Sequence, residues 1–321
     1  MVSSYVTLYS QANNNDSVIY KNSSLFKGLN FMLSTNLLFA LVCLSSISLW
    51  FFVKPIVPIV LSYIFLIASF YEGYVSYQSV IFVVLFTFFC VIYEKKSSQF
   101  AKNFSFIVIL CFLYILIAED FPYSTEIPIF TGVKFSSISK PFWLDINVEK
   151  TVCAVSMAAI LMKRCQTFNE WKKIFKEAFL PLLIITVIII PCGVLTGFIK
   201  FDFKLAAGAF YFLSINLFLV CVAEEVFFRG FLQKRIFDFL SKHFKSKISA
   251  PILANVLVAL LFGYAHLYSG YLFATFAFIA GLGYGYAYQK SGKIESAILV
   301  HFGLNLIHFL FFTYPAYQTL P

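Results

Sequence analysis

Long apolar stretches follow one another along most of the chain and are separated by shorter polar segments. A membrane-spanning helix needs about 20 consecutive apolar residues, and the stretches are continuous rather than alternating at period two, which excludes a transmembrane β-barrel. The pattern predicts an all-α fold, a polytopic transmembrane helical bundle of eight to ten spans. The predicted helices lie near residues 31–53, 55–70, 76–93, 104–118, 151–162, 179–199, 205–228, 250–268, 271–289 and 296–314.

The overall composition is that of a membrane protein. Hydrophobic residues make up 60% of the 321 residues and charged residues only 12%, about half the share found in soluble domains. So few charged side chains cannot cover the surface of a water-soluble fold, and the lipid bilayer is therefore a predicted partner. The seven cysteines are widely spaced, with no Cys-x-x-Cys pair, which argues against a disulfide scaffold.

Positive charge alternates between the predicted loops. The segments rich in Lys and Arg are 94–103, 163–178, 229–249 and 290–295. The segment 119–150 instead carries more acidic than basic residues. Because cytoplasmic loops are enriched in Lys and Arg, this alternation requires 151–162 to cross the membrane and places both termini outside. The net charge of +9 follows from such a topology, and no nucleic-acid partner is predicted.

Two of the basic segments also repeat apolar side chains at helical spacing. Phe168, Trp171 and Phe175 lie beside lysines in the segment 163–178, and the segment 229–249 has the same pattern. Helices with a basic face and an apolar face lie in the membrane interface. Both segments are therefore predicted to be interfacial helices.

Few ionisable side chains fall inside the predicted spans, and the clear cases lie in the last third of the chain. They are Glu224, Glu225, His266, His301 and His308, joined by the amide of Asn305. Such residues are costly in a membrane unless they are paired or face a polar cavity, and they are therefore candidate functional residues.

The spacing of the two glutamates predicts different surroundings for them. Glu225 and Arg229 stand at i,i+4, which favours an ion pair. Glu224 projects about 100° away from Glu225 on the same helix. One carboxylate can then be held ionised as a structural brace, while the other lies in a less polar cavity and serves as a general base.

The next two helices supply the remaining polar groups. Phe262 precedes His266 by one turn, and His301 and Asn305 again stand at i,i+4. A glutamate, two histidines and an asparagine could act as a base, as hydrogen-bond donors and as an amide that stabilises an oxyanion. Glu224, His266 and His301 could equally hold a zinc ion with a water in the open position. The residues alone leave both chemistries open, and no cofactor is certain.

These motifs carry a resemblance. Glu-Glu-x-x-x-Arg at 224–229, Phe-x-x-x-His at 262–266 and His-x-x-x-Asn at 301–305 resemble the motifs of the CPBP family of intramembrane proteases. That family includes the type 2 CAAX prenyl endopeptidases and bacterial members linked to bacteriocin processing or self-immunity. The resemblance implies catalytic roles for Glu224, His266, His301 and Asn305 and supporting roles for Glu225, Arg229 and Phe262. It also implies a peptidase, in a family described both as metal-dependent and as glutamate-dependent.

The resemblance divides the chain into two parts. Residues 1–150 are predicted to be an N-terminal transmembrane region, and 151–321 a protease domain with its motif core at 205–314. The protein is predicted to lie in a bacterial-type inner (plasma) membrane. Its active site is predicted to face the cytoplasm, because the glutamates come at the cytoplasmic end of the predicted helix 205–228.

Three function classes compete. The leading hypothesis is an intramembrane endopeptidase in which Glu224 activates water against a peptide bond of a membrane-associated protein or peptide. The alternative is a non-catalytic membrane scaffold or immunity protein that keeps the protease fold. A transporter with a proton relay is the third, but the ionisable residues form one cluster and do not continue through the first half of the chain. The substrate stays unknown.

Overall fold

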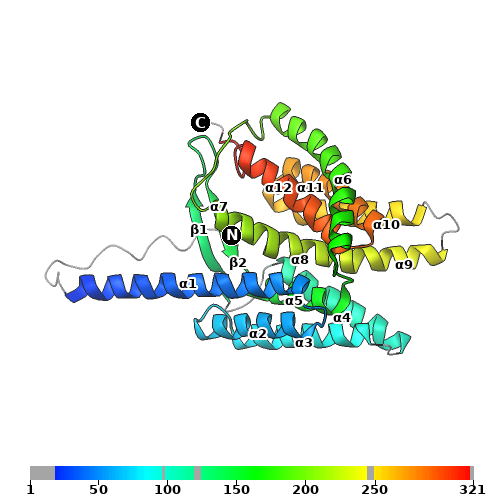
Figure 1. Cartoon of the computed structure of the whole chain (residues 1–321), viewed down its shortest axis with the longest axis horizontal. Coiled ribbons are helices and arrows are strands. Elements are labelled where there is room, and N and C mark those ends of the chain that lie inside the picture. Colours follow the sequence, from blue (N-terminus) through cyan, green and yellow to red (C-terminus); the bar gives the residue numbers. More distant parts are fainter. Residues whose placement is uncertain (1–18, 96–97, 119–123, 244–248, 319–321) are drawn as a thin grey trace.

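The computed structural model describes residues 19–95, 98–118, 124–243 and 249–318. Its helices form two groups, with one long helical segment between them (Figure 1). The lower group holds α1–α5 and the upper group holds α6 and α10–α12. The segment 209–243 contacts helices of both groups, so residues on its two sides face different parts of the protein.

The N-terminal group packs around its shortest helix. Its members are α1 (Ile19–Phe51), α2 (Ile56–Tyr71), α3 (Tyr77–Glu94), α4 (Gln99–Ala118) and α5 (Val148–Leu161). α5 contacts α1, α2, α3 and the segment 209–243, and nearly all of its side chains are buried. Its small residues allow this close approach from several sides. The predicted domain boundary at residue 150 falls inside α5, which packs mainly with the N-terminal helices.

The predicted loop 119–150 contains the two β-strands of the described part of the chain. β1 (Ile127–Val133) pairs antiparallel with β2 (Phe142–Ile146), with shifts of register along the pair. The expectation of an all-α fold was therefore wrong in this detail. The strands are rich in the β-branched and aromatic residues that favour this conformation, but they are too short to give a clear signal between long apolar runs.

The second half of the chain contains five long helical segments in its described residues. α6 (Phe168–Leu195) comes first. The second segment is one continuous helix made of α7 (Ala209–Ile215), a π-helical stretch Asn216–Cys221, α8 (Val222–Glu225), a second π-helical stretch Val226–Gln233 and α9 (Lys234–His243). α10 (Ser249–Ala265), a short 3₁₀ turn Leu267–Ser269, α11 (Tyr271–Ser291) and α12 (Ile294–Phe311) complete the fold.

The two predicted interfacial helices do not exist as separate elements. α6 begins after Thr167, whose hydroxyl accepts from the backbone N–H of Glu170 in a capping box, and it runs on through the predicted span 179–199 to Leu195. Residues 229–243 likewise continue the helix that begins at Ala209. In both cases the basic, amphipathic residues form one end of a long helix. α6 continues through Pro181 and Pro191, as membrane helices can when neighbouring groups satisfy the freed backbone atoms.

Six helical segments of the described residues are long and apolar enough to cross a membrane. They are Ser34–Phe51, Tyr77–Glu94, Gln99–Ile117, Phe168–Leu195, Ala209–Lys242 and Ile294–Phe311. Two shorter apolar helices, Ile56–Tyr71 and Ser249–Ala265, fall below that length. The membrane class of the prediction is supported, whereas its count of eight to ten spans is not confirmed.

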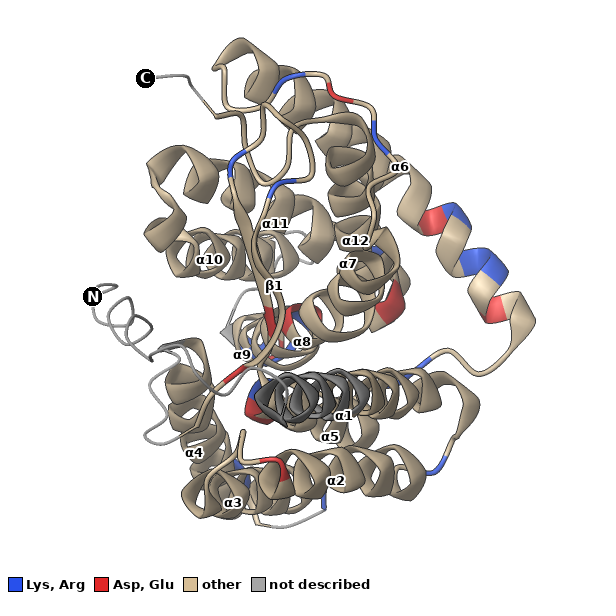
Figure 2. Ribbon diagram, turned by 90° about the vertical axis from the view of Figure 1, so that its left-hand side faces the viewer, with Lys and Arg blue, Asp and Glu red and all other residues tan. Residues whose placement is uncertain are grey.

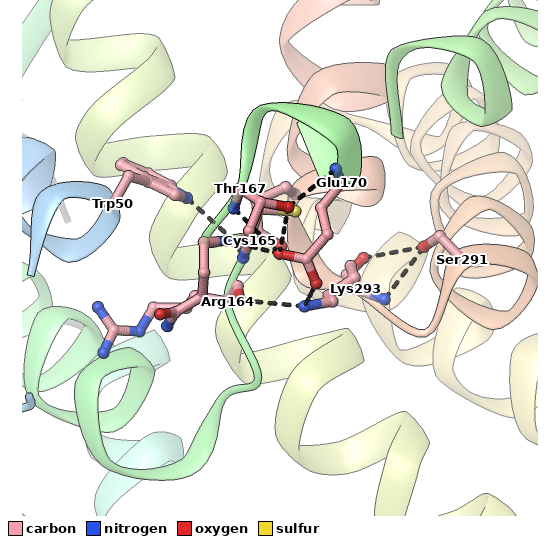
Figure 3. A network of polar contacts seen from close by, with 9 residues as sticks. Trp50, Arg164, Cys165, Thr167, Glu170, Ser291 and Lys293 are labelled. Atoms are coloured by element: carbon pink, nitrogen blue, oxygen red, sulfur yellow. Dashed lines mark hydrogen bonds and ion pairs between the residues drawn. The ribbon is translucent and has the colours of Figure 1, made fainter. Parts of the chain in front are cut away.

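The connections between helices gather at two ends of the molecule. At one end, named the basic end, Arg164 donates to the carbonyls of Phe52 and Val53 and Lys293 donates to the carbonyl of Arg164. Lys293 also forms a 2.7 Å ion pair with Glu170 (Figure 3). The described Lys and Arg residues of this end are Lys54, Lys95, Lys102, Lys163, Arg164, Lys172, Lys173, Lys176, Lys234, Arg235, Lys242, Lys290 and Lys293.

The other end, named the opposite end, holds the β1–β2 pair, the segment 196–208, the turn 266–270 and the segment 312–318. Backbone hydrogen bonds join these pieces, among them Tyr317 N–H to the carbonyl of Phe198 at 2.8 Å and Gln318 N–H to the carbonyl of Ile138 at 2.9 Å. Figure 2 looks onto this end. Residues 1–18 lie outside the described part of the chain, so the predicted side of the N-terminus is not tested.

Candidate active site

The two glutamates lie at a local irregularity of the long helix. Glu224 and Glu225 belong to the four-residue α8, with a π-helical stretch on each side. A π-helical turn contains an extra residue compared with an α-helical turn, so it changes which side chains face a neighbour, and such turns are frequent at functional sites. Apolar periodicity gives no sign of these stretches, and the sequence analysis missed them.

Glu225 is the centre of a buried polar cluster. Its Oε2 lies 3.2 Å from Nε of Arg229, and both side chains are 0% exposed. Its Oε1 accepts from Nδ1 of His301 at 2.9 Å. Arg229 also donates to the carbonyl of Gly281 at 3.1 Å, and its guanidinium carbon lies 4.5 Å from the ring centroid of Phe262. Two cationic or donor groups therefore share one carboxylate, which makes Glu225 a brace between the long helix and α12.

Glu224 has different surroundings, as the spacing predicted. Its side chain is 15% exposed, and its Oε2 lies 4.0 Å from Nε2 of His301. His301 thus stands between the two carboxylates, with Nδ1 turned to Glu225 and Nε2 turned to Glu224. Nδ1 must carry a hydrogen to donate to Glu225. The Nε2 atom is then available for a hydrogen bond with a group that lies beside Glu224.

His266 and Phe262 form the second wall of the site. His266 directly follows the last residue of α10, and its Nδ1 donates to the carbonyl of Phe262 at 2.7 Å. The Phe262 ring lies 4.6 Å from the ring of His266 and 6.0 Å from that of His301. Phe262 therefore spaces the two histidines apart, and the Nε2 atom of His266 is free of this backbone contact.

Asn305 completes the predicted set and has a partner that the sequence analysis missed. Its amide nitrogen donates to Oδ1 of Asn216 at 3.1 Å, and Asn216 is buried in the first π-helical stretch. This contact fixes the orientation of the Asn305 amide, whose nitrogen carries a second hydrogen. The signal in the sequence was an amide within the apolar run 205–228. A polar side chain in such a run is costly unless it has a hydrogen-bond partner.

A cavity of about 100 Å³ lies beside the predicted residues, and Glu224 is not part of its lining. Phe262, His266, His301 and Asn305 line it, together with Tyr284, whose ring stacks on His301 at a centroid distance of 4.4 Å. Tyr284 is a further residue that the motifs did not reveal. The last candidate, His308, also lines the cavity, but its Nε2 donates to the carbonyl of Thr313 at 3.1 Å, so it holds the end of α12 to the segment that follows.

The possible zinc ligands lie around the same site. Across the described ranges, no group of three or more His, Cys, Asp or Glu side chains is gathered closely enough to hold a metal ion. Of the three candidates, the Glu224 and His301 side chains are 4.0 Å apart, and His266 directs Nδ1 to a backbone carbonyl, which leaves its Nε2 atom available. The zinc site stays a prediction, and the roles of the side chains are derived without it.

The position of the glutamates along their helix differs from the expectation. The predicted helix ended at residue 228, which put them near its cytoplasmic end. The observed segment continues to His243, so Glu224 lies about 28 Å from that end and about 22 Å from Ala209, at ~1.5 Å rise per residue. The site therefore lies in the middle of the long helix rather than at its end, and its cytoplasmic orientation stays a prediction.

Comparison with known proteins supports the family resemblance. Residues 206–307 match the family model described as type II CAAX prenyl endopeptidase Rce1-like. This part of the chain, about a third of its length, is similar to the Rce1-like family. The matched segment runs from just before α7 into α12, so it contains all three motifs, and α1–α5 lie outside it. No match was found among curated proteins or solved structures.

The apolar helices point to an integral membrane protein, and the match points to a protease-like domain at residues 206–307. It supports the predicted assignment to the CPBP and CAAX-protease-like proteins. The roles of individual side chains, the catalytic type and the substrate stay predictions.

Proposed function

We propose that the protein is an intramembrane endopeptidase that uses Glu224 to activate water against a peptide bond of a membrane-associated protein or peptide. The observation that carries this proposal is the division of labour between the two glutamates. Glu225 is fully engaged by Arg229 and His301, whereas Glu224 has no such brace and borders the cavity residues. A carboxylate free to accept a proton beside a histidine is the arrangement that general base catalysis needs.

The proposed reaction uses one water and releases an acid and an amine. Glu224 takes a proton from water as its oxygen attacks the peptide carbonyl carbon, with His266 beside it. The oxygen of the tetrahedral intermediate receives hydrogen bonds from Nε2–H of protonated His301 and from the Asn305 amide. Glu224 then gives its proton to the departing nitrogen as the carbon–nitrogen bond breaks. Glu225 accepts from Nδ1 of His301 and so fixes the direction of the Nε2 atom.

Orientation of the groups supports this assignment. Asn216 accepts a hydrogen bond from the Asn305 amide, and the Tyr284 ring stacks on the ring of His301. Both contacts limit the motion of a donor before substrate binds, and preorganised donors of this kind stabilise developing charge without further rearrangement. The membrane is proposed to be a bacterial-type plasma membrane. The cytoplasmic orientation of the site stays a prediction.

Cleavage of a fluorogenic peptide library by the full chain in liposomes tests the proposal. Glu224→Gln and His266→Ala are each expected to lower kcat by about 10²–10⁴-fold, as for loss of a general acid or base. Asp238→Asn, which changes a half-exposed carboxylate in α9, is the matched control and should cleave like the wild type. Chelator is expected to leave the rate unchanged.

Two results would contradict the proposal. Equal silence of the wild type and both variants, with all three folded, would favour the non-catalytic scaffold. Loss of activity with chelator and its return with zinc would show that a metal supplies the water, against the side-chain mechanism.

A further inference from the structure

A second cavity lies between the two groups of helices and is named the interhelical groove. Residues of α1, α6, the long helix and α12 line it, and its volume is about 440 Å³. It shares no described lining residue with the cavity beside His301. Its described lining is apolar or aromatic except for Glu295, near the start of α12. The groove is therefore separate from the candidate active site and contains one buried carboxylate.

The two oxygens of Glu295 have different surroundings. The residue is only 1% exposed. Its Oε1 accepts from the indole Nε1 of Trp50 at 3.2 Å and from the backbone N–H of Cys165 at 2.6 Å. Its Oε2 is buried and accepts no hydrogen bond from any residue that the structure describes. Because a buried acceptor without a donor is costly, we expect an occupant of the groove to supply that donor.

The two cations of the surrounding network are engaged elsewhere (Figure 3). Lys293 lies 2.7 Å from Oε1 of Glu170 and donates to the carbonyl of Arg164 at 3.0 Å. The terminal nitrogens of Arg164 donate to the carbonyls at the end of α1, among them that of Val53. Neither side chain donates to Glu295, so the network has an acceptor to which an external cation can bind.

Aromatic rings surround this acceptor. The ring centroid of Trp50 lies 6.4 Å from that of Trp171 and 6.4 Å from that of Phe218, and all three residues line the groove. The faces of such rings attract a cation, most strongly the faces of tryptophan. Carboxylate and rings together therefore favour a positively charged group.

The carboxylate lies at the depth where lipid headgroups lie. Trp50 is one residue from the end of the candidate span Ser34–Phe51, and Glu295 is one residue from the start of the candidate span Ile294–Phe311. Tryptophan is enriched at this boundary between headgroups and hydrocarbon. Ile298 lines the groove about one turn deeper. The groove thus has a polar, aromatic end at the membrane interface and an apolar remainder within the membrane.

From these observations we propose that the interhelical groove binds one phospholipid whose headgroup carries a primary ammonium. The ammonium donates to Oε2 of Glu295 and lies against the rings of Trp50 and Trp171, and an acyl chain follows the apolar lining past Ile298. A quaternary ammonium has no N–H to donate, and the carboxylate repels a purely anionic headgroup. A water molecule fits poorly, because it needs two to four polar partners.

Quenching of tryptophan fluorescence by lipids with brominated acyl chains tests the proposal. The chain has three tryptophans, and two of them, Trp50 and Trp171, line the groove. Trp143→Phe removes the third, so the remaining emission reports on the groove. The full-length protein is reconstituted in phosphatidylglycerol vesicles with rising fractions of brominated phosphatidylethanolamine, phosphatidylcholine or phosphatidylglycerol. Brominated phosphatidylethanolamine is expected to reach half-maximal quenching at a mole fraction at least fivefold lower than the other two lipids.

Two variants and a control assign the preference to the groove. Glu295→Gln removes the charge and keeps an oxygen that can accept from Trp50, and it is expected to abolish the preference for phosphatidylethanolamine. Leu299→Phe narrows the groove, which Leu299 also lines, and leaves the carboxylate in place; it is expected to weaken the preference as well. Asp238→Asn, which changes a half-exposed carboxylate, should keep it. Circular dichroism of each variant checks the fold.

Several results would overturn the proposal. Equal half-quenching fractions for the three lipids would show that the groove does not select a headgroup. A preference that survives in both Glu295→Gln and Leu299→Phe would place the lipid elsewhere. Equal preference for phosphatidylcholine would exclude the N–H donor. Full reversal of the quenching by millimolar ethanolamine would show that the amine alone binds, without the lipid.

Discussion

The buried pair of Glu225 and Arg229 tests how burial changes the contribution of an ion pair to the free energy of unfolding. The same long helix carries a second pair at the same i,i+4 spacing, Lys234 and Asp238, with Nζ and Oδ2 3.0 Å apart. The buried pair is 0% exposed on both sides, whereas Lys234 and Asp238 are 58% and 45% exposed. Sequence spacing is equal in the two cases, so a difference in stability must come from the surroundings.

Arg229→Met is expected to lower the free energy of unfolding by about 3–5 kcal/mol, because it leaves a buried carboxylate with one partner instead of two. The loss also includes the hydrogen bond to Gly281 and the contact with the Phe262 ring. Lys234→Met is expected to cost less than about 1 kcal/mol, since exposed pairs contribute little. Unfolding by SDS in mixed micelles, followed by circular dichroism, measures both.

A double variant separates the lost pair from the lost packing. Glu225→Gln removes the buried charge but keeps an oxygen that can accept from His301. In the background of Arg229→Met it is expected to recover more than half of the loss, because the uncompensated charge is gone. A double variant as unstable as the sum of the two single changes would refute the reasoning, as would equal losses for Arg229→Met and Lys234→Met.

Three further changes have expected outcomes. Asn305→Ala should lower kcat by about 10²–10³-fold, because one donor to the oxyanion is lost. Asn216→Leu should lower kcat to a smaller extent, with little change in KM. Equal rates for Asn216→Leu and wild type in the peptide assay would show that Asn216 does not orient the Asn305 amide. Gly285→Ala places a carbon in collision with Oδ1 of Asn255 and should lower the free energy of unfolding by about 1–3 kcal/mol. Because Asn255→Ala removes the colliding atom, the double variant should recover most of that loss in the SDS titration. Thr167→Ala removes the capping box of α6 and should cost about 1 kcal/mol in the same titration, while an unchanged midpoint would show that the cap contributes nothing.

The class of fold and most residues of the candidate site could be predicted from the sequence, because both depend on strong local signals. Apolar runs locate the helices, and a charged residue within such a run is rare enough to be noticed. Glu225, Arg229 and His301 were therefore found and meet in the structure. What failed was the extent of helices: the ends of α6 and α9 are amphipathic, and their continuity with the spans depends on capping and packing rather than on hydrophobicity.

The missed features depend on contacts between distant segments. Asn216 joins the site because it lies opposite Asn305, which is 89 positions further along the chain. Tyr284 joins it because α11 packs beside α12. The π-helical stretches arise where neighbouring helices determine which face of the backbone is used. None of these has a periodic pattern, so each becomes visible only when the helices are assembled.

The burial of α5 has a consequence for how the protein enters the membrane. Its 14 residues span only about 21 Å at the usual rise, less than the ~30 Å of a bilayer core. Glu149 and Ser156 are buried within the folded protein, and both would be costly against lipid. During synthesis α5 must therefore remain in a protected position until the preceding helices receive it. We therefore expect the N-terminal helices to pack around α5 before the helix that carries Glu224 packs against it.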